Sequence, residues 1–211
     1  MTVLLVIAVK PKEGLKPYVL MGADSKSVTR NYDIIDGREI LASIEQDENA
    51  KKIFKIYNKL LGVTGRFTTG RHQDLINYLI QNSDEETEIE VFAHMALEFC
   101  KSITGQDGGA YNFNVLICSS KPIANLITFT MNSVSGRTPK LNYHDVFEEN
   151  YNVIFAGEPN LGDLQDEFVN RINPTNLNLS LVKKAANDYL RKSAARYPET
   201  CNQNIQFEFL K

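Results

Sequence analysis

The sequence lacks the features that mark disulfide-rich, metal-binding or nucleic-acid-binding proteins. Its three cysteines are widely spaced, form no Cys-x-x-Cys pair and have no histidine at zinc-ligand spacing. Neither a disulfide framework nor a zinc site is expected, and the cysteines are interpreted as reduced, buried thiols. The 26 acidic residues outnumber the 23 basic ones, giving a net charge of -3 without a basic stripe. A nucleic-acid partner is therefore not expected.

Long hydrophobic runs are also missing. The apolar segment from Val3 to Val9 has no basic region before it and reaches Lys10 and Pro11 without a small-residue cleavage site. It is predicted to be a strand rather than a signal peptide. No run is long enough to span a bilayer, so a cytoplasmic protein without a membrane partner is expected. At 211 residues, the chain is expected to form a single domain over residues 1–211.

The first third of the chain shows strand patterns. Aliphatic and β-branched residues run from Thr2 to Lys10 and again from Tyr18 to Ala23, with proline and glycine between them. This predicts a hairpin of buried strands. A second strand pair is predicted around Asn58, and it ends at residues 62–65, where glycine allows a backbone N–H to approach a ligand.

The pattern then becomes helical. Leu75 and Leu79 recur at the i,i+4 spacing of a helix, and apolar residues at 89–103 form a second stripe. Ser83 and Glu86 have the spacing of a capping box for that second helix. Further strands are predicted at 113–118, 126–131, 153–156 and 205–210, and further helices at 164–172 and 182–189. Residues 132–152 are interpreted as a long surface excursion.

This order predicts an α+β fold. Strands, two helices, strands, two helices and a strand follow one another, and each apolar face has to be buried against another layer. The arrangement that satisfies this requirement stacks two sheets face to face, with a pair of helices outside each. No internal repeat or linker divides the chain.

Several short motifs occur in an order that resembles a known family. Thr2 is followed by Met21-Gly22-Ala23-Asp24-Ser25, and then by Lys51-Lys52-Ile53, Tyr57-Asn58, Leu60-Leu61-Gly62 and Gly65. The sequence is similar in these motifs to the proteasome β subunit and HslV-like N-terminal-nucleophile (Ntn) hydrolases. The motif-level resemblance covers residues 2–67 and is thinner from residue 113 onward.

The resemblance implies a four-layer αββα sandwich with two stacked antiparallel sheets, and a threonine-type peptidase that needs no cofactor or metal. It implies Thr2 as the nucleophile, Lys52 as the cation beside the Thr2 α-amine and Asp24 as the carboxylate that orients Lys52. The backbone at Gly65 and Arg66 would donate to the oxyanion. Because the α-amine is the base, Met1 must be removed. The family also implies a homo-oligomeric ring and leaves an ATPase unfoldase partner open.

The sequence departs from the family at three places. Before the last strand the family has Arg-Asp and Ser-Gly-Gly motifs, whereas in residues 196–203 no Asp or Ser falls clearly in register. Glu158 stands where the family has a serine, and a carboxylate beside the α-amine would raise the pKa of that amine and oppose its role as a base. Arg66 and Phe67 stand in place of a glycine pair after Gly65. Two alternatives therefore stay open, a non-catalytic ring-forming scaffold and an amidase of the same superfamily that acts on small molecules.

Overall fold

The computed structural model of the protein contains eleven strands and four helices in the residues that it describes. These residues are 2–10, 16–36, 38–66, 71–107, 111–121, 124–135, 138–144, 151–172 and 177–211, without the side chains of residues 30–32, 34, 39 and 105–107.

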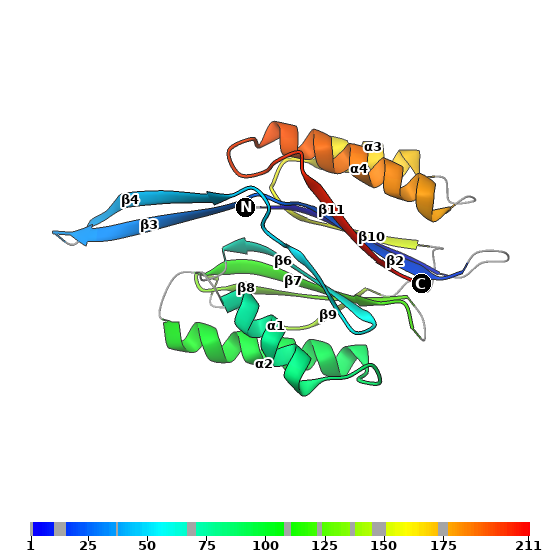
Figure 1. The fold of residues 1–211 in the computed structure, drawn as a ribbon, viewed down its shortest axis with the longest axis horizontal. Coiled ribbons are helices and arrows are strands. Elements are labelled where there is room, and N and C mark those ends of the chain that lie inside the picture. Colours follow the sequence, from blue (N-terminus) through cyan, green and yellow to red (C-terminus); the bar gives the residue numbers. More distant parts are fainter. Residues whose placement is uncertain are drawn as a thin grey trace.

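The first sheet joins strands from both ends of the sequence. Its antiparallel order is β10-β1-β2-β11. The bounds are Val3–Val9 for β1, Tyr18–Asp24 for β2, Tyr151–Gly157 for β10 and Ile205–Leu210 for β11. Helices α3 (Gly162–Arg171) and α4 (Leu179–Arg196) cover one face of this sheet (Figure 1). β1 and β2 are buried along their whole length, which explains their unbroken aliphatic sequences, and the predicted hairpin is confirmed.

The second sheet is built from the middle of the chain. Its antiparallel order is β5-β6-β7-β8-β9. The bounds are Ile53–Ile56 for β5, Lys59–Arg66 for β6, Asn112–Ser119 for β7, Asn125–Asn132 for β8 and Asn142–His144 for β9. Helices α1 (Arg71–Asn82) and α2 (Ile89–Asp107) lie on its outer side (Figure 1).

Buried side chains form three clusters. One lies between the first sheet and α3 and α4, and another between the second sheet and α1 and α2. The third cluster joins the two sheets and includes Leu4, Met21, Leu60 and Leu116. The sheets approach closely at Gly62, where a Cβ would lie 2.7 Å from a methyl carbon of Leu4. Each sheet therefore has buried side chains on both of its faces.

A long β-hairpin, which we call the arm, projects from this body. It consists of β3 (Ser27–Ile35) and β4 (Arg38–Asp47), which pair with each other as a separate two-stranded sheet (Figure 1). Ile40, Leu41 and Ile44 on β4 are each about half exposed. The sequence analysis predicted no strands here, because the segment mixes charged and apolar residues without a regular period.

Two local predictions were wrong. Ser83 does not cap α2, because its hydroxyl donates to the Leu79 carbonyl at the end of α1, at 2.6 Å. Hydroxyl side chains often bond to the carbonyl four residues earlier in this way. Asp84 and Thr87 instead form reciprocal bonds before α2. Residues 132–152 are not wholly a surface excursion, since β9 adds a strand to the second sheet and β10 begins at Tyr151; residues 145–150 lie outside the described part.

Candidate active site

A buried ion pair joins the end of β2 to the start of β5. The Lys52 ammonium nitrogen lies 3.0 Å from Asp24 Oδ1 and 2.9 Å from Oδ2. Asp24 is fully buried, and Lys52 is 7% exposed. Burial removes both charges from water, so each depends on the other for stabilisation.

Two backbone groups complete the surroundings of the Asp24 carboxylate. The Val3 N–H donates to Oδ1 at 2.9 Å, and the Lys26 N–H donates to Oδ2 at 3.0 Å. Each carboxylate oxygen therefore accepts two hydrogen bonds. The bond from Val3 ties the ion pair to the residue that follows Thr2.

The charge of Lys52 is set by opposing influences. Burial is the largest and lowers the pKa of its ammonium below the ordinary lysine value. Asp24 opposes this shift through its charge and its hydrogen bonds, and Cys201 and Glu158 act in the same direction more weakly. The result is a lysine with a lowered pKa that nevertheless has a carboxylate partner.

Thr2 lies beside the end of β10. Its side chain is buried, and its carbonyl oxygen accepts a hydrogen bond from the Glu158 N–H at 3.1 Å. The Glu158 side chain is also buried and accepts a bond from the Thr200 hydroxyl at 2.5 Å. Met1 lies outside the described residues. Glu158 is thus next to Thr2 in space as well as electrostatically coupled to Lys52.

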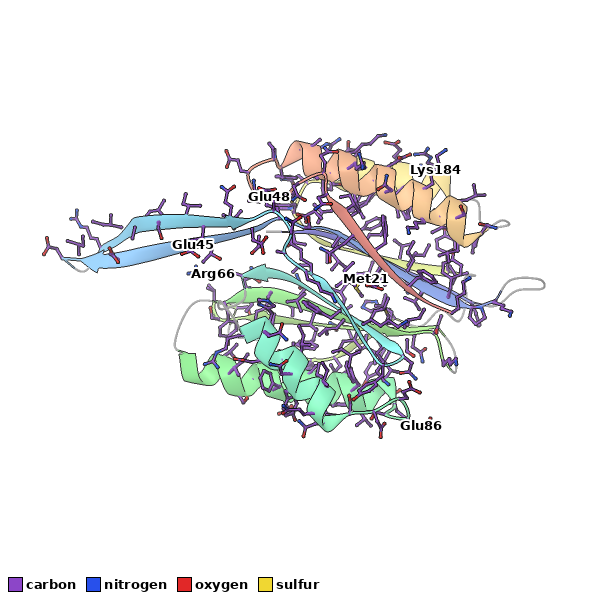
Figure 2. The ribbon with its side chains drawn as sticks, in the orientation of Figure 1. Met21, Glu45, Glu48, Arg66, Glu86 and Lys184 are labelled. Carbon is purple, nitrogen blue, oxygen red and sulfur yellow. The ribbon has the colours of Figure 1, made fainter. Side chains whose placement is uncertain are left out.

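Gly65 and Arg66 end strand β6, where they pair with Phe113 and Asn112 of β7. Gly65 has a φ of +101°, a conformation that favours glycine, and a Cβ there would lie 2.4 Å from the Asn112 carbonyl oxygen. Both residues are exposed, and Arg66 lies at the end of β6 on the same side of the molecule as the arm (Figure 2). Within the described chain, no hydrogen bond connects either residue to Thr2. Phe67 and the rest of 67–70 lie outside the described residues.

The segment before β11 was predicted to have no Asp or Ser in register, and no role was assigned to its other residues. Cys201 is buried within the same charged group, and burial, followed by the negative charge of Asp24, raises the pKa of its thiol to about 11. Thr200 binds Glu158, while Gln206 bonds to the backbone around Lys52. The available signal was the polar run at 202–204, directly ahead of the predicted last strand.

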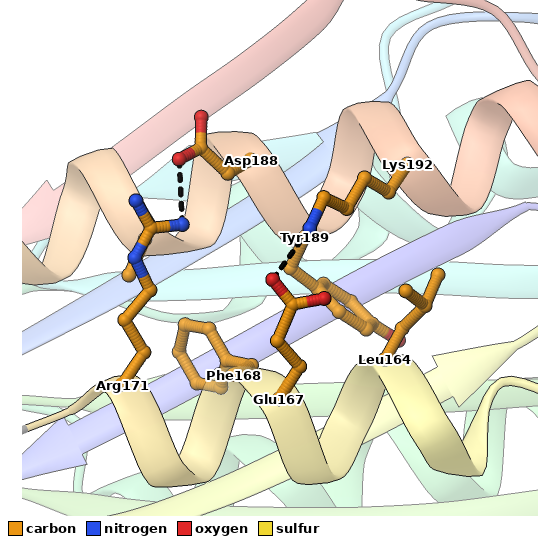
Figure 3. A pocket seen from close by; sticks show the side chains of 8 residues that line it. Leu164, Glu167, Phe168, Arg171, Asp188, Tyr189 and Lys192 are labelled. Atoms are coloured by element: carbon orange, nitrogen blue, oxygen red, sulfur yellow. Dashed lines mark hydrogen bonds and ion pairs between the residues drawn. The ribbon is translucent and has the colours of Figure 1, made fainter.

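A pocket between α3 and α4 is separate from the ion pair. All of its lining residues belong to these two helices: Leu164, Glu167, Phe168, Arg171, Ala185, Asp188, Tyr189 and Lys192. Two ion pairs cross it, from Lys192 to Glu167 at 2.5 Å and from Arg171 to Asp188 at 2.7 Å (Figure 3). These charged side chains are between about one third and one half exposed, so the pairs contribute little to stability.

In the described ranges, no group of three or more His, Cys, Asp or Glu residues is arranged to hold a metal ion. None of the described helices combines the length and hydropathy of a membrane-spanning segment.

Several solved structures have a fold similar to that of this chain. No protein-family model matches the chain, and no curated protein matches it. Anbu, an ancestral beta-subunit, from Yersinia bercovieri has a TM-score of 0.59 at 13% identity, covering 98% of this chain and 81% of its own. Anbu from Pseudomonas aeruginosa, solved as a helical assembly, also has a TM-score of 0.59 at 13% identity, covering 97% and 80%.

A third similar structure is BPH from Thiobacillus denitrificans in complex with epoxomicin. Its TM-score is 0.52 at 13% identity, and the match covers 98% of each chain. Together these matches show that the chain shares the fold of the Anbu proteins and of BPH, with antiparallel sheets and helices in a mixed α and β arrangement. They establish the fold, while the roles of Thr2, Asp24, Lys52, Gly65, Arg66 and Glu158 stay predictions.

Proposed function

We propose that the protein is a threonine-type Ntn hydrolase that cleaves peptide (amide) bonds, with Thr2 as its N-terminal nucleophile. The observation that carries this proposal is the buried Asp24–Lys52 pair, whose carboxylate also accepts the N–H of the residue after Thr2. A buried ion pair has a large desolvation free energy, because both charges lose their hydration. The position of this pair beside the start of β1 therefore favours a catalytic role.

The proposed reaction begins once Met1 has been removed. The Thr2 hydroxyl attacks the carbonyl carbon of the amide, and the free Thr2 α-amine accepts the hydroxyl proton. That proton passes to the departing amine when the C–N bond breaks, leaving an ester on Thr2 that water hydrolyses. The Lys52 ammonium disfavours protonation of the α-amine and lowers its pKa from an ordinary value of about 8. Asp24 orients Lys52 and keeps it charged.

The oxyanion donors are assigned to the backbone N–H groups at Gly65 and Arg66. The positive φ of Gly65 supports this assignment, since such a conformation can turn an N–H away from the strand ladder. The reacting carbonyl would bind at this end of β6. Arg66 would then modulate the approach of the substrate.

The same proposal extends to the architecture and assembly. Residues 1–211 form one domain arranged as a four-layer αββα sandwich, and copies of the chain form a homo-oligomeric ring in the cytoplasm. The helical assembly of Anbu from P. aeruginosa supports self-association of this fold. An ATPase partner stays a hypothesis with no specific observation behind it.

One observation favours a second function, that of a non-catalytic scaffold. Glu158 is buried beside Thr2, and its carboxylate favours the protonated form of a nearby amine. An amine held as ammonium cannot act as the base. The scaffold would keep the fold and the assembly without turnover.

The test starts with the intact mass of protein produced in cells, which reports whether Thr2 is the free N-terminus. Protein that begins at Thr2 is then incubated with epoxomicin, with a broad panel of peptides and with a panel of small-molecule amides, beside a Thr2→Ala control. A covalent adduct and hydrolysis in the wild type, both absent from Thr2→Ala, support the hydrolase. Retained Met1, or a free Thr2 with neither adduct nor turnover, favours the scaffold. Hydrolysis of small amides alone would identify the small-molecule amidase.

A further inference from the structure

The side-chain amide of Gln206 connects the two segments that carry the ion pair. Gln206 lies on β11 opposite Ala23. Its Nε2 donates to the carbonyl oxygens of Asp24 at 3.3 Å and Ala50 at 3.0 Å. Its Oε1 accepts from the N–H groups of Lys52 at 3.1 Å and Ile53 at 3.3 Å. The amide therefore uses both donor hydrogens and both acceptor lone pairs.

This connection matters because no strand pairing holds Asp24 and Lys52 together. Asp24 ends β2 in the first sheet, whereas Lys52 precedes β5 in the second sheet. The whole arm lies between them in sequence. Gln206 reaches from the first sheet to the backbone of Lys52 and thereby limits how far the two segments can separate.

We infer that Gln206 is a positioning residue, which holds Lys52 against Asp24 and so keeps the ammonium buried beside Thr2. Its importance for catalysis rests on the proposed hydrolase function, but its effect on the ion pair does not. Loss of the amide would leave the N–H groups of Lys52 and Ile53 without their partner. The segment would then open to water, and the Lys52 ammonium would leave the carboxylate more often.

The chain offers a matched control in Asn202. Its amide also lies in the segment before β11, and its Oδ1 accepts from the Ser25 N–H at 3.1 Å. Its Nδ2 donates to the carbonyl oxygen and the carboxylate of Glu48, both at 2.8 Å. Asn202 thus joins the two ends of the arm, where Glu48 lies (Figure 2), without bonding to Asp24 or Lys52.

The test measures how fast an acylating reagent modifies each lysine, followed by peptide mass spectrometry at a temperature well below unfolding. Gln206→Met removes all four bonds at nearly constant length, and we expect about tenfold faster acylation of Lys52. Gln206→Glu keeps the acceptor for both N–H groups and should give an intermediate rate. Asn202→Ala should leave the Lys52 rate unchanged.

Lys59 is the internal reference, because its side chain is buried at a different place, with its ammonium 2.6 Å from Asn58 Oδ1. Faster acylation of Lys52 with Lys59 unchanged supports the positioning role. An unchanged acylation rate of Lys52 in both Gln206 variants overturns it. Two other results would also overturn it: acylation of Lys52 that is as fast in Asn202→Ala as in Gln206→Met, or acylation of Lys59 that becomes faster together with that of Lys52.

The acylation rate does not depend on turnover, so the two proposals can fail separately. If Lys52 responds to Gln206 while the wild type hydrolyses nothing, the positioning role stands and the hydrolase proposal fails. If the wild type hydrolyses peptides and Lys52 does not respond, the positioning role fails alone. In an active enzyme, Gln206→Glu should lower kcat and shift the alkaline limb of kcat against pH, because kcat and this limb both depend on where the Lys52 ammonium lies.

Discussion

Gly157 faces the Thr2 backbone so closely that a Cβ at position 157 would lie 1.5 Å from the Thr2 carbonyl oxygen. Gly157 pairs with Val3 across β10 and β1, and its φ is +114°. Both the space and the backbone conformation therefore require glycine. This contact sets the position of Thr2 relative to the first sheet.

Gly157→Ala should consequently destabilise the protein by at least about 2 kcal/mol, since Thr2 or β10 has to move. Urea unfolding measures the change. Gly162→Ala is the control, because a Cβ at that helical position meets nothing within 4 Å, and alanine there should be neutral or stabilising by up to about 1 kcal/mol. Equal effects of the two substitutions would contradict the close approach at Thr2.

Removing one charge of the Asp24–Lys52 pair should destabilise the protein more than replacing both charges with neutral side chains. Lys52→Ala leaves the fully buried Asp24 carboxylate without its cation, and we expect a loss of roughly 3–5 kcal/mol in the free energy of unfolding. Asp24→Asn combined with Lys52→Met removes both charges and should cost less than Lys52→Ala alone. For the exposed pair of Lys101 and Glu98, Lys101→Ala should cost less than about 1 kcal/mol. A double variant less stable than Lys52→Ala would show that the charges themselves stabilise the fold.

Glu158 should control the acidic limb of activity in the proposed hydrolase. Its negative charge favours the protonated Thr2 amine, so Glu158→Gln should lower the apparent pKa of that amine. The acidic limb of kcat/KM against pH would then move down by roughly half to one pH unit. Glu199→Gln changes an exposed carboxylate nearby and should leave the limb in place. If the acidic limb of kcat/KM is unchanged in Glu158→Gln, the charge of Glu158 does not influence the pKa of the Thr2 α-amine.

Buried thiols should make the protein less stable in alkali. Burial raises the pKa of Cys100 to about 12, against an ordinary value of 9.0. The pKa of Cys201 is raised to about 11, and burial is the largest cause of that shift. Above pH 9 the unfolded thiols lose protons that the folded thiols keep, so the free energy of unfolding falls as pH rises toward the folded pKa values. Each thiol contributes at most about 1.4 kcal/mol per pH unit. Cys100→Ala should reduce this slope between pH 9 and 11 in chemical unfolding, and an identical slope would contradict the assignment.

The arm should be dispensable for the stability of the body. Its strands pair with each other, and two-stranded ribbons add little stability by themselves. Replacing residues 29–45 with an Asn-Gly turn keeps the pairing of Ser27 with Asp47 at its base. Thermal unfolding should then shift by only a few degrees, about what a change of 1 kcal/mol produces in a chain of this size. Collapse of the fold would show that the arm stabilises the body.

The sequence alone predicted the parts of the fold that depend on local periodicity. The aliphatic runs of β1 and β2 indicate strands that are buried on both faces, and the i,i+4 stripe of α1 indicates a helix that is buried on one face. The strands of the arm were not predicted. They pair only with each other and are exposed, so burial imposes no regular alternation of apolar and polar residues on them. The predicted cap of α2 was wrong because the Ser83 hydroxyl donates instead to the nearby carbonyl oxygen of Leu79.

The motifs also singled out Asp24 and Lys52, since each stands in a recognisable short stretch of sequence. Only the tertiary structure decided what surrounds them. Thr200 and Gln206 approach this group through the pairing of β11 with β2, which joins opposite ends of the chain. No local pattern encodes such contacts, because the register of distant strands is fixed by the burial of the whole core rather than by the residues that finally meet.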